Sequence, residues 1–127
     1  MARSLLFILG AAHFLSGLTA LLAPQFFYDT IPGLSLMGPF HLHLVRDVGL
    51  AFIASGGAVL WGALKYDRSA AVAGSVFPLL HAFLHIHIWV RRDFIFDYIT
   101  ASDFFMVIIP ACAMMWLAKG LTRWKTA

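Results

Sequence analysis

Histidine and aspartate side chains gather near one end of the hydrophobic stretches of this 127-residue chain. The residues are His41, His43, Asp47, His81, His85, His87 and Asp103, while the sixth histidine, His13, lies inside the first stretch. Ionisable groups at membrane depth are costly unless they are paired, ligated or hydrated, so they mark function by default. Imidazole together with carboxylate is the chemistry of transition-metal ligation, which makes a metal site the first hypothesis.

The composition is that of a membrane protein. Hydrophobic residues make up 61% of the chain and charged residues only 12%, whereas a soluble domain is usually about 45–50% apolar and about 25% charged. The net charge of +3 is small and no basic stripe alternates with aromatic residues, so nucleic-acid binding is unsupported. Cys112 is the only cysteine, which excludes an internal disulfide and paired-thiol redox chemistry.

Four hydrophobic runs predict four membrane-spanning helices, at about 5–22, 43–64, 70–90 and 101–118. Each run has close to the ~20 residues that a helix needs to cross the hydrocarbon core. In lipid the backbone must satisfy its own polar groups, and four strands cannot close a barrel, so helices are expected. The sequence therefore predicts an all-α integral membrane protein, with a single transmembrane domain of four bundled helices over residues 1–127.

Lysine and arginine are unevenly divided between the two ends of these helices. Six lie on the side of the two termini, whereas Arg46, Arg91 and Arg92 lie on the other side. The positive-inside rule then predicts that both termini are cytoplasmic and that the histidine-rich end faces outward. The outward loop at 24–42 is rich in aromatic, glycine and proline residues, which suits a segment at the headgroup level or a cap over the bundle.

Helical spacing places the polar residues of the second run on one face. His43 and Asp47 are four residues apart, and small residues continue the same stripe toward the cytoplasmic end. Small side chains let a second helix approach closely in a membrane. The stripe is therefore predicted to point into the bundle, with a contact surface made of Ala51, Ala54 and Ala58.

The other three runs offer comparable polar faces. His81 and His85 are also four residues apart, His13 lies on a glycine-rich face of the first run, and Asp103 lies near the start of the fourth. A rise of ~1.5 Å per residue puts all of these side chains in the outer half of the bundle. We therefore expect one pocket that opens outward and receives residues from four helices.

The leading hypothesis is a membrane protein that binds one or two transition-metal ions, of iron, copper or zinc. Helical bundles build metal centres from i, i+4 ligand pairs and carboxylates on facing helices. The predicted ligands are His43, Asp47, His81, His85 and Asp103. His13 is the next candidate for holding the cofactor, and Arg46 would neutralise a carboxylate or hold an anionic ligand. His41 and His87 fall off these faces and are expected to be structural.

Two other hypotheses stay open. His13 and His81 lie at similar depth on different helices and would supply two axial imidazoles to a b-type haem. Alternatively, the chain is an accessory subunit of a larger membrane complex, or a proton-coupled carrier that uses histidine–aspartate relays and functions as a homo-oligomer. The sequence leaves open whether the protein is an enzyme, with redox or oxygen chemistry at a metal as the candidate activity.

Two stretches carry a family resemblance. The run FYDTIPG at 27–33, followed by HLVRDVG at 43–49, resembles a pattern in small four-helix bacterial integral membrane proteins whose activity is uncharacterised. The resemblance implies a bacterial inner-membrane location and one functional turn formed by His43, Arg46, Asp47 and Gly49. In such a membrane the outward side inferred from the lysine and arginine distribution is the periplasmic side. The spacing of His81 and His85 is partly similar to the histidine boxes of membrane hydroxylases, although the adjoining His-His pairs of those families are missing.

Overall fold

A computed structural model describes residues 1–122, and every regular element in that range is helical. Four stretches are long and apolar enough to cross a membrane: α1 (Ala2–Leu22), α3 (Leu42–Lys65), α4 (Arg68–Arg91) and a composite fourth at Tyr98–Lys119. The composite stretch consists of α5 (Tyr98–Ser102), the π-helical segment η2 (Asp103–Ile108) and α6 (Ile109–Lys119). Each predicted helix boundary lies within three residues of the observed one, so the prediction of four helices long and apolar enough to span a membrane is confirmed.

Three helices begin at a side chain that caps the first turn. His41 Nδ1, Asp67 Oδ1 and Asp97 Oδ1 accept the backbone N–H three residues ahead, at 3.3, 3.0 and 3.0 Å respectively. Such caps satisfy donors that have no partner inside the helix. His41 therefore determines where α3 begins, which is a structural role of the kind expected from its position off the predicted ligand faces.

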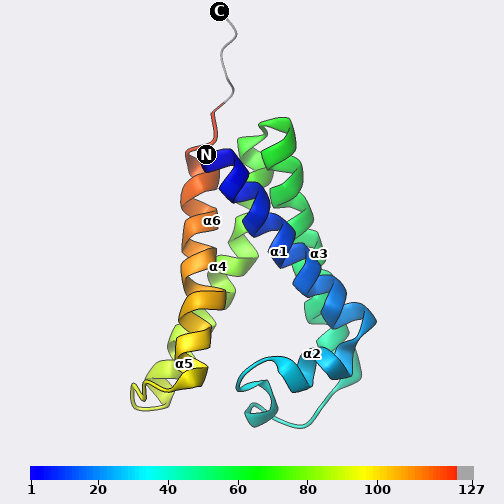
Figure 1. Cartoon of the computed structure of the whole chain (residues 1–127), viewed down its shortest axis with the longest axis vertical. Helices are drawn as coiled ribbons and strands as arrows, with labels where there is room; N and C mark the ends of the chain where they lie inside the picture. The colour runs from blue at the N-terminus through cyan, green and yellow to red at the C-terminus, as the bar shows by residue number, and fades with distance from the viewer. Residues whose placement is uncertain (123–127) are drawn as a thin grey trace, which may run out of the picture.

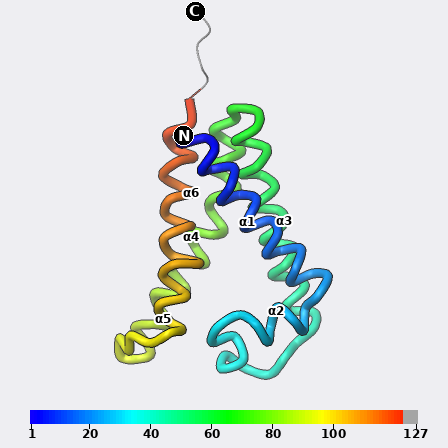
Figure 2. The backbone as a smooth tube through the Cα atoms, viewed as in Figure 1, coloured from blue at the N-terminus to red at the C-terminus, as the bar shows by residue number. Residues whose placement is uncertain are grey.

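The spanning helices form two pairs that meet at one end of the molecule and diverge toward the other (Figure 1). α1 packs along α3, α4 packs along η2 and α6, and contacts between α3 and α4 join the pairs. The N-terminus and the end of α6 lie together where the pairs meet, and the backbone tube shows the same divergence (Figure 2). We refer to that end as the closed end and to the opposite end, which carries α2 and α5, as the open end.

Buried apolar side chains concentrate at the closed end. The main cluster joins all four spanning helices through Leu6, Val59, Ala71, Met114 and Leu117, among others. A smaller cluster, made of Ala82, Ile108 and Ala111, joins α4 to the fourth helix nearer the open end. The closed end is therefore the packed core of the molecule, and it holds the two helix pairs together.

Glycines allow the helix backbones to approach closely at both main contacts. A Cβ added at Gly17 of α1 would lie 2.7 Å from the carbonyl oxygen of Gly49 in α3. A Cβ added at Gly74 of α4 would lie 2.7 Å from the carbonyl oxygen of Ser55 in α3. In lipid there is no hydrophobic driving force for helices to associate. Membrane helices therefore associate through close van der Waals packing, which small residues allow.

The predicted inward orientation of the His43–Asp47 stripe is wrong for its polar part, whereas Ala58, nearer the closed end, does lie against Gly74 of α4. The side chains of His43 and Asp47 are 82% and 52% exposed, and Ala54 on the same stripe is exposed as well. The reason is that α3 meets α1 through Gly49 and Gly56, which lie about 180–200° around the helix from Asp47. The closest contacts between helices therefore turn this part of the predicted site away from α1.

The connection between α1 and α3 crosses the open end. It contains the short helix α2 (Pro24–Thr30) and the 3-10 turn η1 (Leu34–Leu36), and Tyr28 Oη donates a hydrogen bond to the carbonyl of Gly38. Gly33 has a φ of 79°, and a Cβ there would lie 2.7 Å from Cγ2 of Ile99 in α5. The loop thus contacts the other helix pair, as a cap over the bundle would.

Candidate functional site

A chain of three polar side chains runs along the α4 side of the open half. Asp103 Oδ1 lies 2.9 Å from His85 Nδ1, and His85 Nε2 lies 3.2 Å from His81 Nε2. The side chains of His85 and Asp103 are only 20% and 13% exposed. α4 supplies both histidines one turn apart, and η2 supplies the carboxylate, so two neighbouring helices build the chain.

The order of these contacts fits one pair of tautomers for the two imidazoles. A proton on Nδ1 of His85 faces the carboxylate of Asp103 and leaves Nε2 of His85 as an acceptor. His81 then donates its Nε2 proton to that acceptor, so both protons are directed toward Asp103. Nδ1 of His85 and Oδ1 of Asp103 are 2.9 Å apart, but Nδ1 makes no hydrogen bond, so the two groups are close without being aligned.

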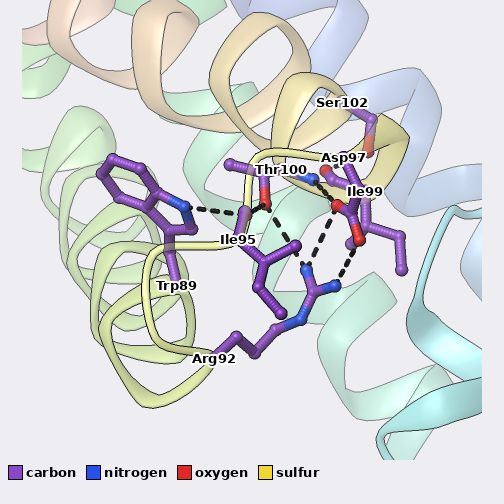
Figure 3. Close-up of polar contacts among 7 residues, drawn as sticks. All are labelled: Trp89, Arg92, Ile95, Asp97, Ile99, Thr100 and Ser102. Atoms are coloured by element: carbon purple, nitrogen blue, oxygen red, sulfur yellow. Dashed lines mark hydrogen bonds and ion pairs between the residues drawn. The ribbon is translucent and has the colours of Figure 1, made fainter.

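The position of Asp103 depends on a polar network at the open end, drawn in Figure 3. Arg92 donates to both carboxylate oxygens of Asp97 and to Thr100 Oγ1. Thr100 Oγ1 and Trp89 Nε1 both donate to the carbonyl of Ile95, at 2.9 and 3.0 Å. The network joins the end of α4 to α5, and α5 continues directly into the segment that carries Asp103.

Charge pairing dominates the electrostatics of this network. The Arg92 hydrogen bond, helped by the backbone N–H of Thr100, lowers the pKa of Asp97 to about 2. The same hydrogen bond raises the pKa of Arg92. Both groups are therefore charged across the physiological range, and the connection between α4 and α5 is held by a permanent ion pair.

Asp103 also begins a π-helical segment. Residues Asp103–Ile108 form the π turn, and Pro110 follows within the first turn of α6. A π turn inserts one residue into the helical ladder and changes the direction of the side chains that precede it. Such turns occur frequently at functional sites, and this one directs a carboxylate toward a buried imidazole.

Aromatic rings connect this polar chain to α1. His13 stacks on Phe52 of α3, with ring centroids 4.4 Å apart, and Phe52 meets the edge of His81 at 5.6 Å. Phe77 stacks on His81 at 5.9 Å and is 6.4 Å from His13. Nε2 of His13 is buried without a hydrogen-bond partner among residues 1–122. We refer to His13, Phe52, Phe77 and His81 as the ring cluster.

A second histidine–carboxylate pair lies apart from the ring cluster, at the start of α3. His43 Nε2 and Asp47 Oδ2 are 3.3 Å apart and largely exposed. Arg46 is exposed too, and lines a shallow surface pocket together with Phe40, His41 and Leu42. The first turn of α3, with His43, Arg46 and Asp47, therefore lies on the protein surface at the open end.

The structure divides the five predicted metal ligands into two groups. It brings together His81, His85 and Asp103, and it leaves His43 and Asp47 as a separate exposed pair. Within the described part of the chain, no three histidine, cysteine or acidic side chains are arranged to hold a metal ion. Asp103 lies on the Nδ1 side of His85 while His81 lies on the Nε2 side, so the three form a line.

Sequence reasoning missed two parts of this arrangement. Phe77 precedes His81 by four residues, so extending the histidine stripe by one turn would have identified it. Phe52 gives no such signal, because its contacts with His13 and His81 depend on how three helices pack. Part of the Arg92–Asp97–Thr100 network could have been predicted from the sequence. An aspartate three residues before Thr100 is typical of a helix N-cap, in which the carboxylate accepts the backbone N–H.

Comparison with known proteins adds no identification. No family model, no curated protein and no solved structure matches this chain.

Proposed function

We propose that the protein is a proton-coupled integral membrane protein in which Asp103, His85 and His81 form a proton relay. The observation that supports the proposal is the line of two contacts, at 2.9 and 3.2 Å, through the two nitrogens of His85. An imidazole that accepts at one nitrogen and donates at the other transfers a proton without moving its heavy atoms. Histidine and aspartate chains are the usual proton relays of membrane pumps and transporters.

The relay has one end near the surface and one end near the middle of the membrane. Asp103 lies just beyond α5 at the open end, whereas His81 is one helical turn, or ~6 Å, deeper than His85. Beyond His81, the closed end is filled by the apolar cluster of α1, α3, α4 and α6. The relay therefore exchanges protons between the open face and the mid-membrane region, and does not conduct them across the whole bilayer.

The distribution of lysine and arginine supports one orientation of the relay in the membrane. Arg3, Lys65, Arg68 and Lys119 lie at or near the ends of helices at the closed end, and the positive-inside rule assigns that end to the cytoplasm. Arg123 and Lys125, which belong to the same predicted group, lie outside the described residues. In a bacterial inner membrane the relay would then open to the periplasm. Assembly as a homo-oligomer or within a larger complex stays a prediction.

Metal binding is the second candidate, and one distance favours it. Two imidazole nitrogens bound to the same ion at ~2.0–2.1 Å with tetrahedral geometry lie about 3.3 Å apart. The Nε2 atoms of His81 and His85 are 3.2 Å apart, and a carboxylate on Nδ1 is the usual orienting partner of a metal-bound histidine. Iron, copper or zinc would need further ligands, from solvent, a substrate or a second chain, because no third ligand approaches within residues 1–122.

A b-type haem between His13 and His81 has less support. Phe52 contacts both imidazoles, by a stack with His13 and by an edge contact with His81. A macrocycle between the two histidines would have to displace this ring. Haem binding would therefore require α3 to reorganise, whereas the relay requires only that the Asp103 carboxylate and Nδ1 of His85, already 2.9 Å apart, rotate into line.

Hydrogen exchange at the His81 ring tests the relay. The full-length protein, labelled with ¹⁵N-histidine in lipid nanodiscs, is transferred to D₂O and the loss of the His81 Nε2 proton is followed by NMR. We expect Asp103→Asn to slow this exchange at least tenfold, because general acid–base groups contribute about 10²–10⁴ in rate. The matched control is Asp47→Asn, which removes the carboxylate of the exposed pair. Equal rates in Asp103→Asn and wild type would exclude the relay.

Metal titration distinguishes the second candidate. Zn²⁺ is added to the same nanodiscs and the bound ion is counted by elemental analysis after gel filtration. One ion per chain that is lost in His81→Ala and His85→Ala, and kept in the exposed control His87→Ala, would make metal binding the function. Binding that is weak or equal in all three variants leaves the relay as the better account.

A further inference from the structure

One helix of the bundle exposes charged side chains inside its membrane-spanning part. Arg46 and Asp47 are both exposed and lie four and five residues after the start of α3. The other exposed charged residues of the spanning stretches in residues 1–122 are each the first, second or last residue of a helix. Charged side chains within a spanning segment are costly in lipid and are almost always paired or directed into a bundle. The exposed charges of α3 therefore indicate a protein partner.

The depth of these charges and the contacts they make within the chain leave them short of partners. α3 has 24 residues and is ~36 Å long, so it exceeds a hydrocarbon core of ~30 Å by ~3 Å at each end. Asp47, ~7.5 Å from the start of the helix, then lies ~4 Å inside the core. Within residues 1–122, Asp47 is paired only with His43, at 3.3 Å, and Arg46 takes part in no ion pair.

The two charges lie on either side of an apolar strip of the helix surface. At ~100° per residue, Arg46 and Asp47 point to opposite sides of Leu50, which lies one turn farther along and is 52% exposed. Ala54, one more turn along, is exposed as well, and a small residue there lets a second helix approach closely. We refer to Arg46, Asp47, Leu50 and Ala54 as the outer face of α3.

The outer face of α3 is complementary to a second copy of itself. Two copies in one membrane have the same orientation, so their α3 helices are parallel and equivalent residues lie at equal depth. A two-fold axis along the membrane normal then places Asp47 of one copy beside Arg46 of the other, and repeats this contact on the opposite side of the strip. Both charges of each copy thus gain a partner of opposite sign.

We propose that the protein forms a parallel homodimer through the outer face of α3, with two Arg46–Asp47 ion pairs between the copies. Leu50 and Ala54 pack against their counterparts along the axis. The inference goes beyond the proposed function and does not depend on it, because the relay belongs to α4 and η2 and each copy keeps its own. Failure of the dimer therefore leaves the relay untouched, and failure of the relay leaves the dimer untouched.

Charge reversal on the outer face of α3 tests the inference. Full-length chains labelled at the N-terminus with a donor or an acceptor dye are reconstituted together in liposomes, and energy transfer is measured against protein density. We expect saturable transfer in the wild type, and dimerisation weakened about tenfold or more in Arg46→Asp and in Asp47→Arg, because each change places like charges in contact. The matched control is Arg91→Asp, which reverses an exposed arginine of α4 at the same end and should dimerise like the wild type.

Two combinations of these variants distinguish a lost ion pair from a variant that fails to fold. The double variant Arg46→Asp with Asp47→Arg exchanges the two charges and should dimerise again. Donor-labelled Arg46→Asp should also pair with acceptor-labelled Asp47→Arg, because one copy then carries two aspartates where the other carries two arginines.

Three results would overturn the inference. Energy transfer in the wild type that only follows random crowding would mean that lipid or another protein covers the outer face of α3. Saturable transfer that is equal in the wild type and in both single variants would place the dimer contact elsewhere. Loss of transfer that neither combination restores would show that the copies are not joined by these ion pairs.

Discussion

At the scale of single residues, the same chemistry occurs in two environments. His43–Asp47 and His85–Asp103 are both imidazole–carboxylate pairs, at 3.3 and 2.9 Å. The first contact was predictable, because its members are four residues apart on one helix. The exposure of His43 and Asp47 was not predictable, because it depends on which faces of α3 meet the other helices. The buried pair joins α4 to η2, so no local spacing predicts it.

We expect the Arg92–Asp97 ion pair to make the thermal stability of the folded protein depend on pH in the acidic range. The pKa of Asp97 is about 2 in the folded protein, below the ordinary value of 3.8. Because the pKa of Asp97 is lower in the folded than in the unfolded protein, its ionisation stabilises the fold at pH values above the ordinary pKa of 3.8. That stabilisation is lost as the pH falls from 3.8 through 2. We expect the melting temperature of the wild type to fall between pH 4 and pH 2, with a smaller fall in Asp97→Asn.

Asp93 provides the control for this measurement. It is an exposed carboxylate in the same connection and makes no ion pair among the described residues. Melting temperatures are measured in one detergent at pH 7, 4 and 2.5. An acid-induced fall in Asp97→Asn as large as in the wild type and in Asp93→Asn would refute the assignment of acid sensitivity to the Arg92–Asp97 pair.

At the scale of helices, hydropathy was sufficient to predict the spanning segments and their ends. Runs of about twenty apolar residues leave few alternatives in lipid. The π turn at Asp103–Ile108 was not predictable, because one extra residue in a helical ladder depends on packing between helices. The glycine-rich face of α1 was recognised, and Gly10 and Gly17 are buried at the contact with α3.

Two adjacent glycines of α3 test the packing of α1 on α3. A Cβ at Gly56 would lie 2.6 Å from the backbone nitrogen of Phe14, whereas one at Gly57 would lie 3.8 Å from the Phe14 ring. We expect Gly56→Ala to destabilise the protein by about 1–3 kcal/mol through overpacking. Gly57→Ala should be neutral or stabilising by up to about 1 kcal/mol, because alanine favours a helix. Thermal or denaturant unfolding of both variants in one detergent checks the order, and equal stabilities would contradict this helix contact.

Removing one residue from the π turn tests its role in directing Asp103. Deletion of the exposed residue Phe105 would convert η2 to a regular helix and rotate Asp103 by ~100° relative to α6. We expect the deletion to fold and to slow His81 ring exchange as much as Asp103→Asn does. Phe105→Ala, which keeps the extra residue, should exchange like the wild type. If the deletion also exchanged like the wild type, the π turn would have no part in the relay.

At the scale of the whole molecule, the two helix pairs separate toward the open end (Figure 1), where Gly33 in the loop between α1 and α3 lies close to Ile99 of the other pair. The sequence predicted an outward aromatic loop, and its contact with Ile99 through Gly33 agrees with a cap. The divergence itself was not predictable, because it depends on the apolar cluster being confined to the closed end. For this reason the structure has, in place of the single six-residue pocket expected from depth alone, the His81–His85–Asp103 chain, a separate surface pair, and His13 stacked on Phe52.

Gly33 provides a test of the cap. Valine at this position would be strained at a φ of 79°, so the loop would shift even where residue 99 is replaced by cysteine. In a background with Cys112→Ala, we expect Ile99→Cys to react faster with a membrane-impermeant maleimide when Gly33 is replaced by valine. The control Ser35→Val alters an exposed residue of the same loop. Unchanged reactivity in Gly33→Val would mean that the loop does not cover α5.

The most direct test of the relay is the hydrogen bond between its two histidines. With ¹⁵N-histidine labelling, a scalar coupling between the Nε2 atoms of His81 and His85 reports a shared proton, and their chemical shifts report the tautomers. We predict a measurable coupling in the wild type, with the His85 proton on Nδ1, and loss of that tautomer preference in Asp103→Asn. No coupling, together with His85 shifts that do not respond to Asp103→Asn, would contradict the relay.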